Sequence, residues 1–206
     1  MTSRLIAHSS LSAPEVGGRA PMASAPMVYN DDGSVAWERM WTTFCELASV
    51  GGPPHRGELL QAPTGANANS SAYRQVVHEI IRGIQLVSGL HAAPATPGWI
   101  AIECLSSAQA RWLSEQINQE NVECHWCGKE IFVPAAANFT LKGEIKNVIT
   151  AVAKTTHYWD AHVSKEVKQT LAFEAALQKA IDWLRHCLHA QSKEKQSEGE
   201  LTRKSA

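Results

Sequence analysis

The chain has 206 residues, of which 44% are hydrophobic and 19% are charged, and its formal net charge is −1 at pH 7. This composition is typical of a globular protein and excludes a wholly disordered chain. A charge so close to zero disfavours a nucleic-acid-binding surface, which needs clustered Lys and Arg. No run approaches the roughly 18 apolar residues of a membrane span. We therefore expect neither a nucleic-acid partner nor a membrane partner.

The N-terminal segment, residues 1–30, is rich in Ser, Ala, Pro and Gly and lacks a continuous apolar stretch. That composition indicates a disordered tail and not a secretory signal. Five cysteines in a chain without such a signal favour reduced thiols. We therefore expect a cytoplasmic protein whose single domain covers residues 31–190.

The first part of this domain, residues 31–92, is predicted to be a helical pair joined by a Gly/Pro-rich loop. Apolar residues at helical spacing indicate a first helix: Trp37, Met40, Trp41, Phe44 and Leu47. Gly51 to Pro54 ends it, because proline cannot continue a helix. A second apolar stripe predicts the next helix: Tyr73, Val76, Val77, Ile80, Ile81, Ile84 and Val87. Gly83, at the edge of this stripe, would allow close approach of another element.

Residues 98–134 have the character of a β-α-β-β unit. A mostly apolar strand is predicted over 98–105, and a helix capped by Ser106 or Ser107 follows to about Gln119. Two short strands, over 121–126 and 129–133, meet at a corner formed by Cys127 and Gly128. We expect a small antiparallel or mixed sheet.

Residues 139–190 are predicted to form a second helical pair, followed by a disordered charged tail over 191–206. The core face of its first helix, over 141–162, is marked by apolar spacing: Ile145, Val148, Ile149, Val152, Thr156 and Trp159. The last helix, from Ser164, is expected to bury a second set: Leu171, Phe173, Leu177, Ile181, Leu184 and Leu188. The predicted fold class is therefore α+β, a small β-α-β-β sheet packed against about four long amphipathic helices.

The sharpest motif is the sequence Cys-His-Trp-Cys-Gly at 124–128. A C-x-x-C pair followed by glycine, placed between two strands, predicts a turn that presents both thiols on one side. Over Val122 to Ile131 the motif resembles half of a zinc ribbon or a rubredoxin-type knuckle. The resemblance implies zinc, or iron as the alternative metal, bound by Cys124 and Cys127.

A closed structural zinc site needs two further ligands, and the chain has no second C-x-x-C pair. Cys104 is the best third thiol, because it ends the strand that precedes the hairpin. The fourth ligand would be a histidine, chosen from a set that the sequence does not narrow further: His91, His125, His157, His162, His186 and His189. Positions five apart on a helix diverge by about 140°, so His157 and His162 are not expected to bind one ion together. A redox pair and inert thiols remain alternatives to metal binding.

The metal site predicts a metal-binding protein with a regulatory or accessory role, and two other classes of function stay open. The loop over 51–70 is long for an unstructured connection, and its His55 and Arg56 could line an enzyme site for a small-molecule ligand together with His157. Asp160, one turn beyond His157, could orient that imidazole as a general base. Alternatively, the long apolar helix faces complete a homo-oligomer, most simply a homodimer, in an adaptor module without chemistry.

Overall fold

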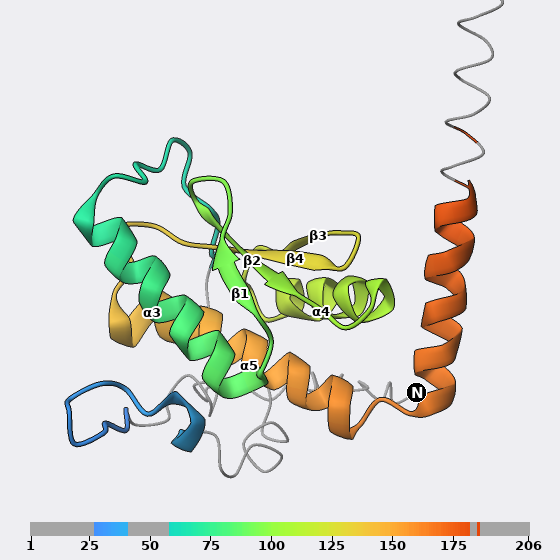
Figure 1. Ribbon diagram of the computed structural model, residues 1–206, viewed down its shortest axis with the longest axis horizontal. Helices are drawn as coiled ribbons and strands as arrows, with labels where there is room; N and C mark the ends of the chain where they lie inside the picture. The colour runs from blue at the N-terminus through green and yellow to red at the C-terminus, as the bar shows by residue number, and fades with distance from the viewer. Residues whose placement is uncertain (1–26, 41–57, 182–184, 186–206) are drawn as a thin grey trace, which may run out of the picture.

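The computed structural model describes residues 27–40, 58–181 and 185 of the chain. The elements of this part follow in the order η1 (Trp37–Arg39), α3 (Ser71–Ser88), β1 (Ala92–Pro94), β2 (Trp99–Glu103), α4 (Ser107–Gln119), β3 (His125–Cys127), β4 (Glu130–Pro134), η2 (Leu141–Ile145) and α5 (Lys146–Ala161). A further helix spans residues 165–181. The predicted α+β class is confirmed (Figure 1).

The sheet contains one more strand than the predicted β-α-β-β unit. β1 pairs antiparallel with β2, with Ala92 opposite Ile102, and the described strands form an antiparallel sheet of order β1-β2-β4-β3. The chain therefore makes one hairpin before α4 and another after it. β1 escapes prediction because it has three residues and ends in Pro94, a residue that usually indicates a turn or a sheet edge.

Helices cover one face of this sheet. The side chains that point to that face have 0% exposed surface: Ile100, Ile102, Ile131 and Val133. Ala101 and Phe132, which alternate with them, are only half-buried, as expected for strands with a single core face. α4 packs against β3 and β4, α3 packs against β1, and α5 lies against both α3 and α4 (Figure 1).

An aromatic stack occupies the opposite face of the sheet. The His125 ring lies 4.4 Å from the Trp99 ring, edge to face, and 4.8 Å from the Phe132 ring, in parallel stacking, between centroids. His125 stands directly opposite Phe132 in the β3–β4 pairing. This histidine, one of the possible metal ligands, is thus held in a ring stack.

α3 confirms the second predicted helix together with both of its ends. Its N-cap residue Ser70 accepts a hydrogen bond from the Tyr73 N–H at 3.4 Å, and Gly89 ends it with a φ of 67°. A Cβ atom on Gly83 would lie 2.9 Å from Ile149 Cγ1 and 3.2 Å from the Trp37 ring. The glycine therefore permits the close approach of α5 that its position predicted.

α5 confirms the core face expected for the helix over 141–162, since the six predicted residues are buried: Ile145, Val148, Ile149, Val152, Thr156 and Trp159. The first turn of this predicted helix is instead the π-helical η2, in which Gly143 departs from helical geometry at φ −107° and ψ −106°. The Glu144 carboxylate fixes that turn by accepting hydrogen bonds from the Thr140 N–H at 2.8 Å and hydroxyl at 2.9 Å.

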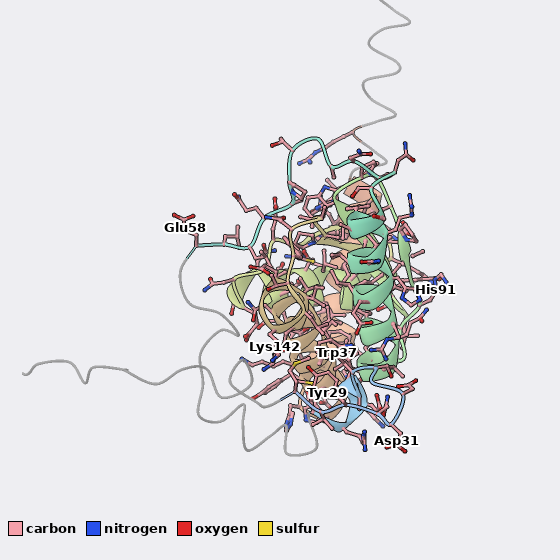
Figure 2. The ribbon with its side chains drawn as sticks, turned by 90° about the vertical axis from the view of Figure 1, so that its left-hand side faces the viewer. Tyr29, Asp31, Trp37, Glu58, His91 and Lys142 are labelled. Atoms are coloured by element: carbon pink, nitrogen blue, oxygen red, sulfur yellow. The ribbon has the colours of Figure 1, made fainter. Side chains whose placement is uncertain are left out.

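The first predicted helix is described only at its beginning. η1 is a single 3-10 turn, and residues 41–57, with Trp41, Phe44 and Leu47, lie outside the described residues. Trp37 (0% exposed) and Met40 (6% exposed) are buried as expected. Figure 2 shows Trp37 inside the body of the protein, beside α3.

The helix over 165–181 departs from prediction, because much of its apolar surface is exposed. Ala175 is buried at 4% exposure, but Phe173 is 70% exposed and Leu177 is 51% exposed. This helix stands away from the sheet beyond the end of α5 (Figure 1), so only one of its sides meets the rest of the protein. Leu184 and Leu188 lie outside the described residues. Within the described segments no helix is long and apolar enough to cross a bilayer.

Candidate functional site

The C-x-x-C segment belongs to a β-hairpin, as predicted, but the turn comes later than expected. Cys127 stands opposite Glu130 in the β3–β4 pairing, which leaves Gly128 and Lys129 as the two turn residues. Gly128 has a φ of 62° and Lys129 has a negative φ, the pattern of a type II′ turn. Residues 125–127 are therefore extended, and the turn does not fold Cys124 back towards Cys127.

The extended backbone separates the predicted thiol pair. Cys124 is buried at 6% exposure whereas Cys127 is exposed, because side chains three positions apart in an extended chain point to opposite faces. Cys104, at 3% exposure, follows Ile102 on the helix-covered face. The prediction of two thiols side by side in a Cys124–Cys127 knuckle was wrong, and Cys104 shares its side of the sheet with Cys124 instead.

Cys104 and Cys124 lie in an environment that holds both as thiols. Burial raises the pKa of each to about 12, and the nearby Cys124 adds to the rise in the pKa of Cys104. α4 fixes the Cys124 backbone, since the Ser114 hydroxyl and the Asn118 amide donate to its carbonyl at 3.1 and 2.6 Å. Across the described residues, no group of three or more His, Cys, Asp or Glu side chains is placed to hold a metal.

The loop site proposed from the sequence is described only in part. His55 and Arg56 lie outside the described residues, so a site built on them stays a prediction. The remainder of the loop, residues 58–70, is fastened beside the C-terminal end of α4, where the Ala62 N–H donates to Glu123 Oε2 at 2.8 Å.

The end of α5 brings two histidines together. The His157 and His162 ring centroids are 5.3 Å apart at an interplanar angle of 66°, so the predicted divergence of this pair was wrong. α5 ends at Ala161, and His162 is its C-cap residue, whose φ of −119° departs from the ideal helical value of about −63° although the residue keeps the right-handed helical region. Asp160, the predicted partner of His157, is exposed, and its backbone carbonyl accepts a hydrogen bond from Lys168 Nζ at 3.4 Å.

A cavity with mainly apolar walls and a few polar groups lies between α4 and α5. It has a volume of about 150 Å³ and six lining residues: Trp112, Gln116, Glu120, Lys154, Thr155 and Tyr158. Trp112 and Gln116 of α4 and its C-cap residue Glu120 are four positions apart. Lys154 and Tyr158 on α5 have the same spacing, so each element presents one continuous stripe to the cavity. The Trp112 ring also contacts the buried Trp159 ring at 5.5 Å between centroids, which fixes one wall.

A largely buried ion pair forms the polar end of this cavity. The Lys154 ammonium binds Glu120 Oε1, and the two side chains are only 13% and 12% exposed. The second carboxylate oxygen, Glu120 Oε2, is buried without a hydrogen-bond partner among the described residues. Burial raises the pKa of Glu120, and Lys154 opposes the rise. An acceptor buried in this way carries a desolvation cost that a bound donor would remove.

A second cavity, of about 430 Å³, lies between α3, η2 and the segment before η1. Its charged residue, Glu79, already accepts hydrogen bonds from the Trp37 indole at 2.8 Å and from Arg82 at 2.6 and 3.0 Å. These bonds hold the N-terminal segment on α3. The charged group of this cavity is therefore already paired within the protein.

Comparisons of the chain with protein-family models, with curated proteins and with solved structures give no match. The cavity between α4 and α5 is the candidate functional site, because it combines aromatic walls with a buried acceptor. No sequence pattern considered above predicts this cavity. The spacing of Trp112, Gln116 and Glu120 is a detectable signal for one wall of the cavity. Lys154 belongs to a helix far along the sequence, and no local pattern reveals that this helix packs against α4.

Proposed function

We propose that this protein binds a small polar molecule in the cavity between α4 and α5. The observation that carries the proposal is the buried Glu120 Oε2 beside Lys154 in the lining of that cavity. Small-molecule sites commonly combine apolar and aromatic walls with a few convergent polar groups. A small-molecule ligand was among the partners expected from the sequence.

The volume of the cavity limits the size of the ligand. A cavity of about 150 Å³ holds a molecule of roughly benzene size. A ligand of about seven non-hydrogen atoms with a binding free energy of about 0.6–0.8 kcal/mol per atom has a Kd on the order of 0.1–1 mM. Ligand binding is therefore best measured by NMR.

The polar groups determine the chemistry of the ligand. Glu120 Oε2 requires a donor, and the Lys154 ammonium has three donors, of which Glu120 Oε1 takes one. The Thr155 hydroxyl donates to the backbone carbonyls of Ala151 at 2.8 Å and Val152 at 3.2 Å, so it offers the cavity an acceptor only. A hydroxyl or primary amide, which both donates and accepts, matches this set of groups. An anionic ligand is disfavoured, because it would be repelled by the Glu120 carboxylate.

Two probes of nearly equal shape test the proposal. Phenol and toluene each fill a benzene-sized cavity, but only phenol carries a hydroxyl. We expect phenol to shift the NMR signals of the Trp112 indole and of the α4 and α5 amides in a saturable manner. Toluene should bind at least about tenfold more weakly, because it leaves Glu120 Oε2 unsatisfied.

Variants separate the cavity from the rest of the surface. The double variant Glu120→Gln, Lys154→Met removes both charges while preserving side-chain length, and it should abolish the preference for phenol over toluene. Glu115→Gln is the matched control, since Glu115 lies on the same helix with a 53% exposed side chain. Equal binding of the two probes to the native protein, or an unchanged preference in the double variant, would overturn the proposal.

Zinc binding through cysteine stays a second proposal, and the shared burial of Cys104 and Cys124 supports it. Thiolates are strong zinc ligands once a metal displaces their protons. Cys127, on the other side of the sheet, would have to move to join them. Elemental analysis should give stoichiometric zinc, or iron, which is lost in Cys104→Ser, Cys124→Ser; folded protein purified without metal would rule this proposal out.

Self-association is the remaining proposal, and the exposed apolar residues Val167, Phe173 and Leu177 support it. They lie on the helix over 165–181, so a second copy could cover them. Light scattering should show an oligomer that Phe173→Glu, Leu177→Glu converts to a monomer. Monomeric native protein at micromolar concentration would exclude it.

A further inference from the structure

A second ligand-binding feature lies at the C-terminal end of α5, where His157 and His162 meet. His157 is half-buried and His162 is exposed, so a small solute reaches at least one ring directly. Tyr158 lies beside both, with ring centroids 6.2 Å from His157 and 5.0 Å from His162. The three rings form a compact group on one turn of chain.

The separation of the two imidazoles matches the separation required by a shared metal ion. Zinc lies about 2.0–2.1 Å from a ligating imidazole nitrogen, and the ring centre lies about 1.1 Å further out. Two rings at a tetrahedral angle of about 109° therefore have centres about 5.2 Å apart. The observed centroids are 5.3 Å apart. Their interplanar angle of 66° is compatible, because a ligating ring rotates about the metal–nitrogen bond.

The end of α5 attracts cations, and one of them, the Lys168 ammonium, already donates to the Asp160 carbonyl there at 3.4 Å. The last turn of a helix carries the negative end of its dipole, which attracts positive charge. The Tyr158 carbonyl accepts hydrogen bonds from the His162 and Val163 N–H groups, both at 3.0 Å, and these bonds hold the His162 backbone over the helix end. Asp160 adds an exposed carboxylate to the same turn.

We infer that His157 and His162 form a two-imidazole site for a divalent transition-metal ion such as Ni²⁺ or Zn²⁺, with water completing the coordination. The donors are borderline ligands that suit these ions and not Mg²⁺ or Ca²⁺. The site is separate from the three described cysteines. Its occupation does not depend on the proposed small-molecule cavity, although Tyr158 borders both.

Titration of the full chain with Ni²⁺ alone, followed by NMR of the imidazole C–H signals, tests the inference. Ni²⁺ is paramagnetic and broadens the signals of the residues that bind it. The His157 and His162 signals should broaden together, at a Ni²⁺ concentration at least about tenfold below that needed for the single exposed histidines His78 and His91. Mg²⁺ at the same concentrations should have no effect.

Single substitutions test whether the two rings act as one site. In His157→Gln the remaining His162 signal should require the same Ni²⁺ concentration as His78, and His162→Gln should have the converse effect. His91→Gln is the matched control and should leave the paired site unchanged. The inference is overturned if His157 and His162 respond separately in the native protein, or respond no earlier than His78. The native titration decides this even if a variant fails to fold.

Discussion

Trp37 donates its indole N–H to the Glu79 carboxylate at 2.8 Å, and Arg82 holds the same carboxylate from the next turn of α3. Arg82 also donates to the Val35 carbonyl at 2.9 Å. One carboxylate and one guanidinium thus fasten the N-terminal segment to the helix that crosses the core. Trp37 in turn packs at Gly83, where α3 approaches α5.

Trp37→Phe should destabilise the protein by about 2 kcal/mol, because it removes a hydrogen bond to a charged group and some buried volume. The free energy of unfolding in urea measures this. Arg39→Ala is the control, since Arg39 makes its bonds to Tyr29 and Asn30 at the exposed surface, and its loss should be within about 0.5 kcal/mol. Equal losses of unfolding free energy in Trp37→Phe and Arg39→Ala would contradict a stabilising contact between Trp37 and Glu79.

Gly83→Ala should also destabilise the protein, although alanine favours helix by about 1 kcal/mol. The added Cβ would press on Ile149 and on Trp37, and overpacking of a core costs about 1–3 kcal/mol. Ile149→Val removes the nearest methyl group. A double-mutant cycle should therefore show that Ile149→Val costs less in the Gly83→Ala protein than in the native protein; additive losses would refute the close approach.

The cysteines should differ in reactivity within the folded protein. At pH 8 a thiol with a pKa of about 12 is ionised in about one molecule in ten thousand. Exposed Cys127 should therefore react with iodoacetamide well before Cys104 and Cys124, as tandem mass spectrometry can follow. Denatured protein is the control, in which the three should react alike. If Cys124 reacted as fast as Cys127, the burial of Cys124 would be refuted and the predicted side-by-side pair of thiols would be favoured again.

Glu120 should make the stability of the protein depend on pH in a defined direction. Its pKa is raised from 4.5 on folding, so folding favours the protonated form. The contribution of this pKa difference to the free energy of unfolding is complete below pH 4.5. It is lost as the pH rises through the pKa of Glu120 in the folded protein. Urea unfolding between pH 4 and pH 8 should show the native protein losing stability with rising pH relative to Glu120→Gln, and Glu115→Gln should follow the native curve. If the unfolding free energies of the native protein and Glu120→Gln changed in parallel with pH, the raised pKa of Glu120 would be contradicted.

The predictable parts of this fold are those in which local signals agree. α3 combines an apolar stripe, the Ser70 cap and Gly89, and Ser106 caps α4 as expected. β2 and β4 could be predicted from short apolar runs. β1 could not, because its three residues are strand only through their pairing with β2.

The sites were harder to predict because they depend on how elements meet and end. The position of the hairpin turn, one residue past Cys127, decides on which face each thiol lies. The contact between His157 and His162 forms where α5 ends, at a C-cap residue whose φ of −119° departs from that of a continuous helix. The contact of Glu120 with Lys154 depends on how α4 packs against α5, which neither helix encodes alone.

The order of the strands also affects how the sheet behaves towards other chains. Its two outer strands, β1 and β3, have three residues each, and β1 ends in Pro94, which has no N–H to offer. A short edge interrupted by proline gives an approaching strand little backbone to pair with. The longer strands β2 and β4 lie between these edges, and their Ile and Val residues would favour intermolecular β-structure if they were exposed. The strand order therefore keeps the backbone of these apolar segments paired within the sheet and away from other chains.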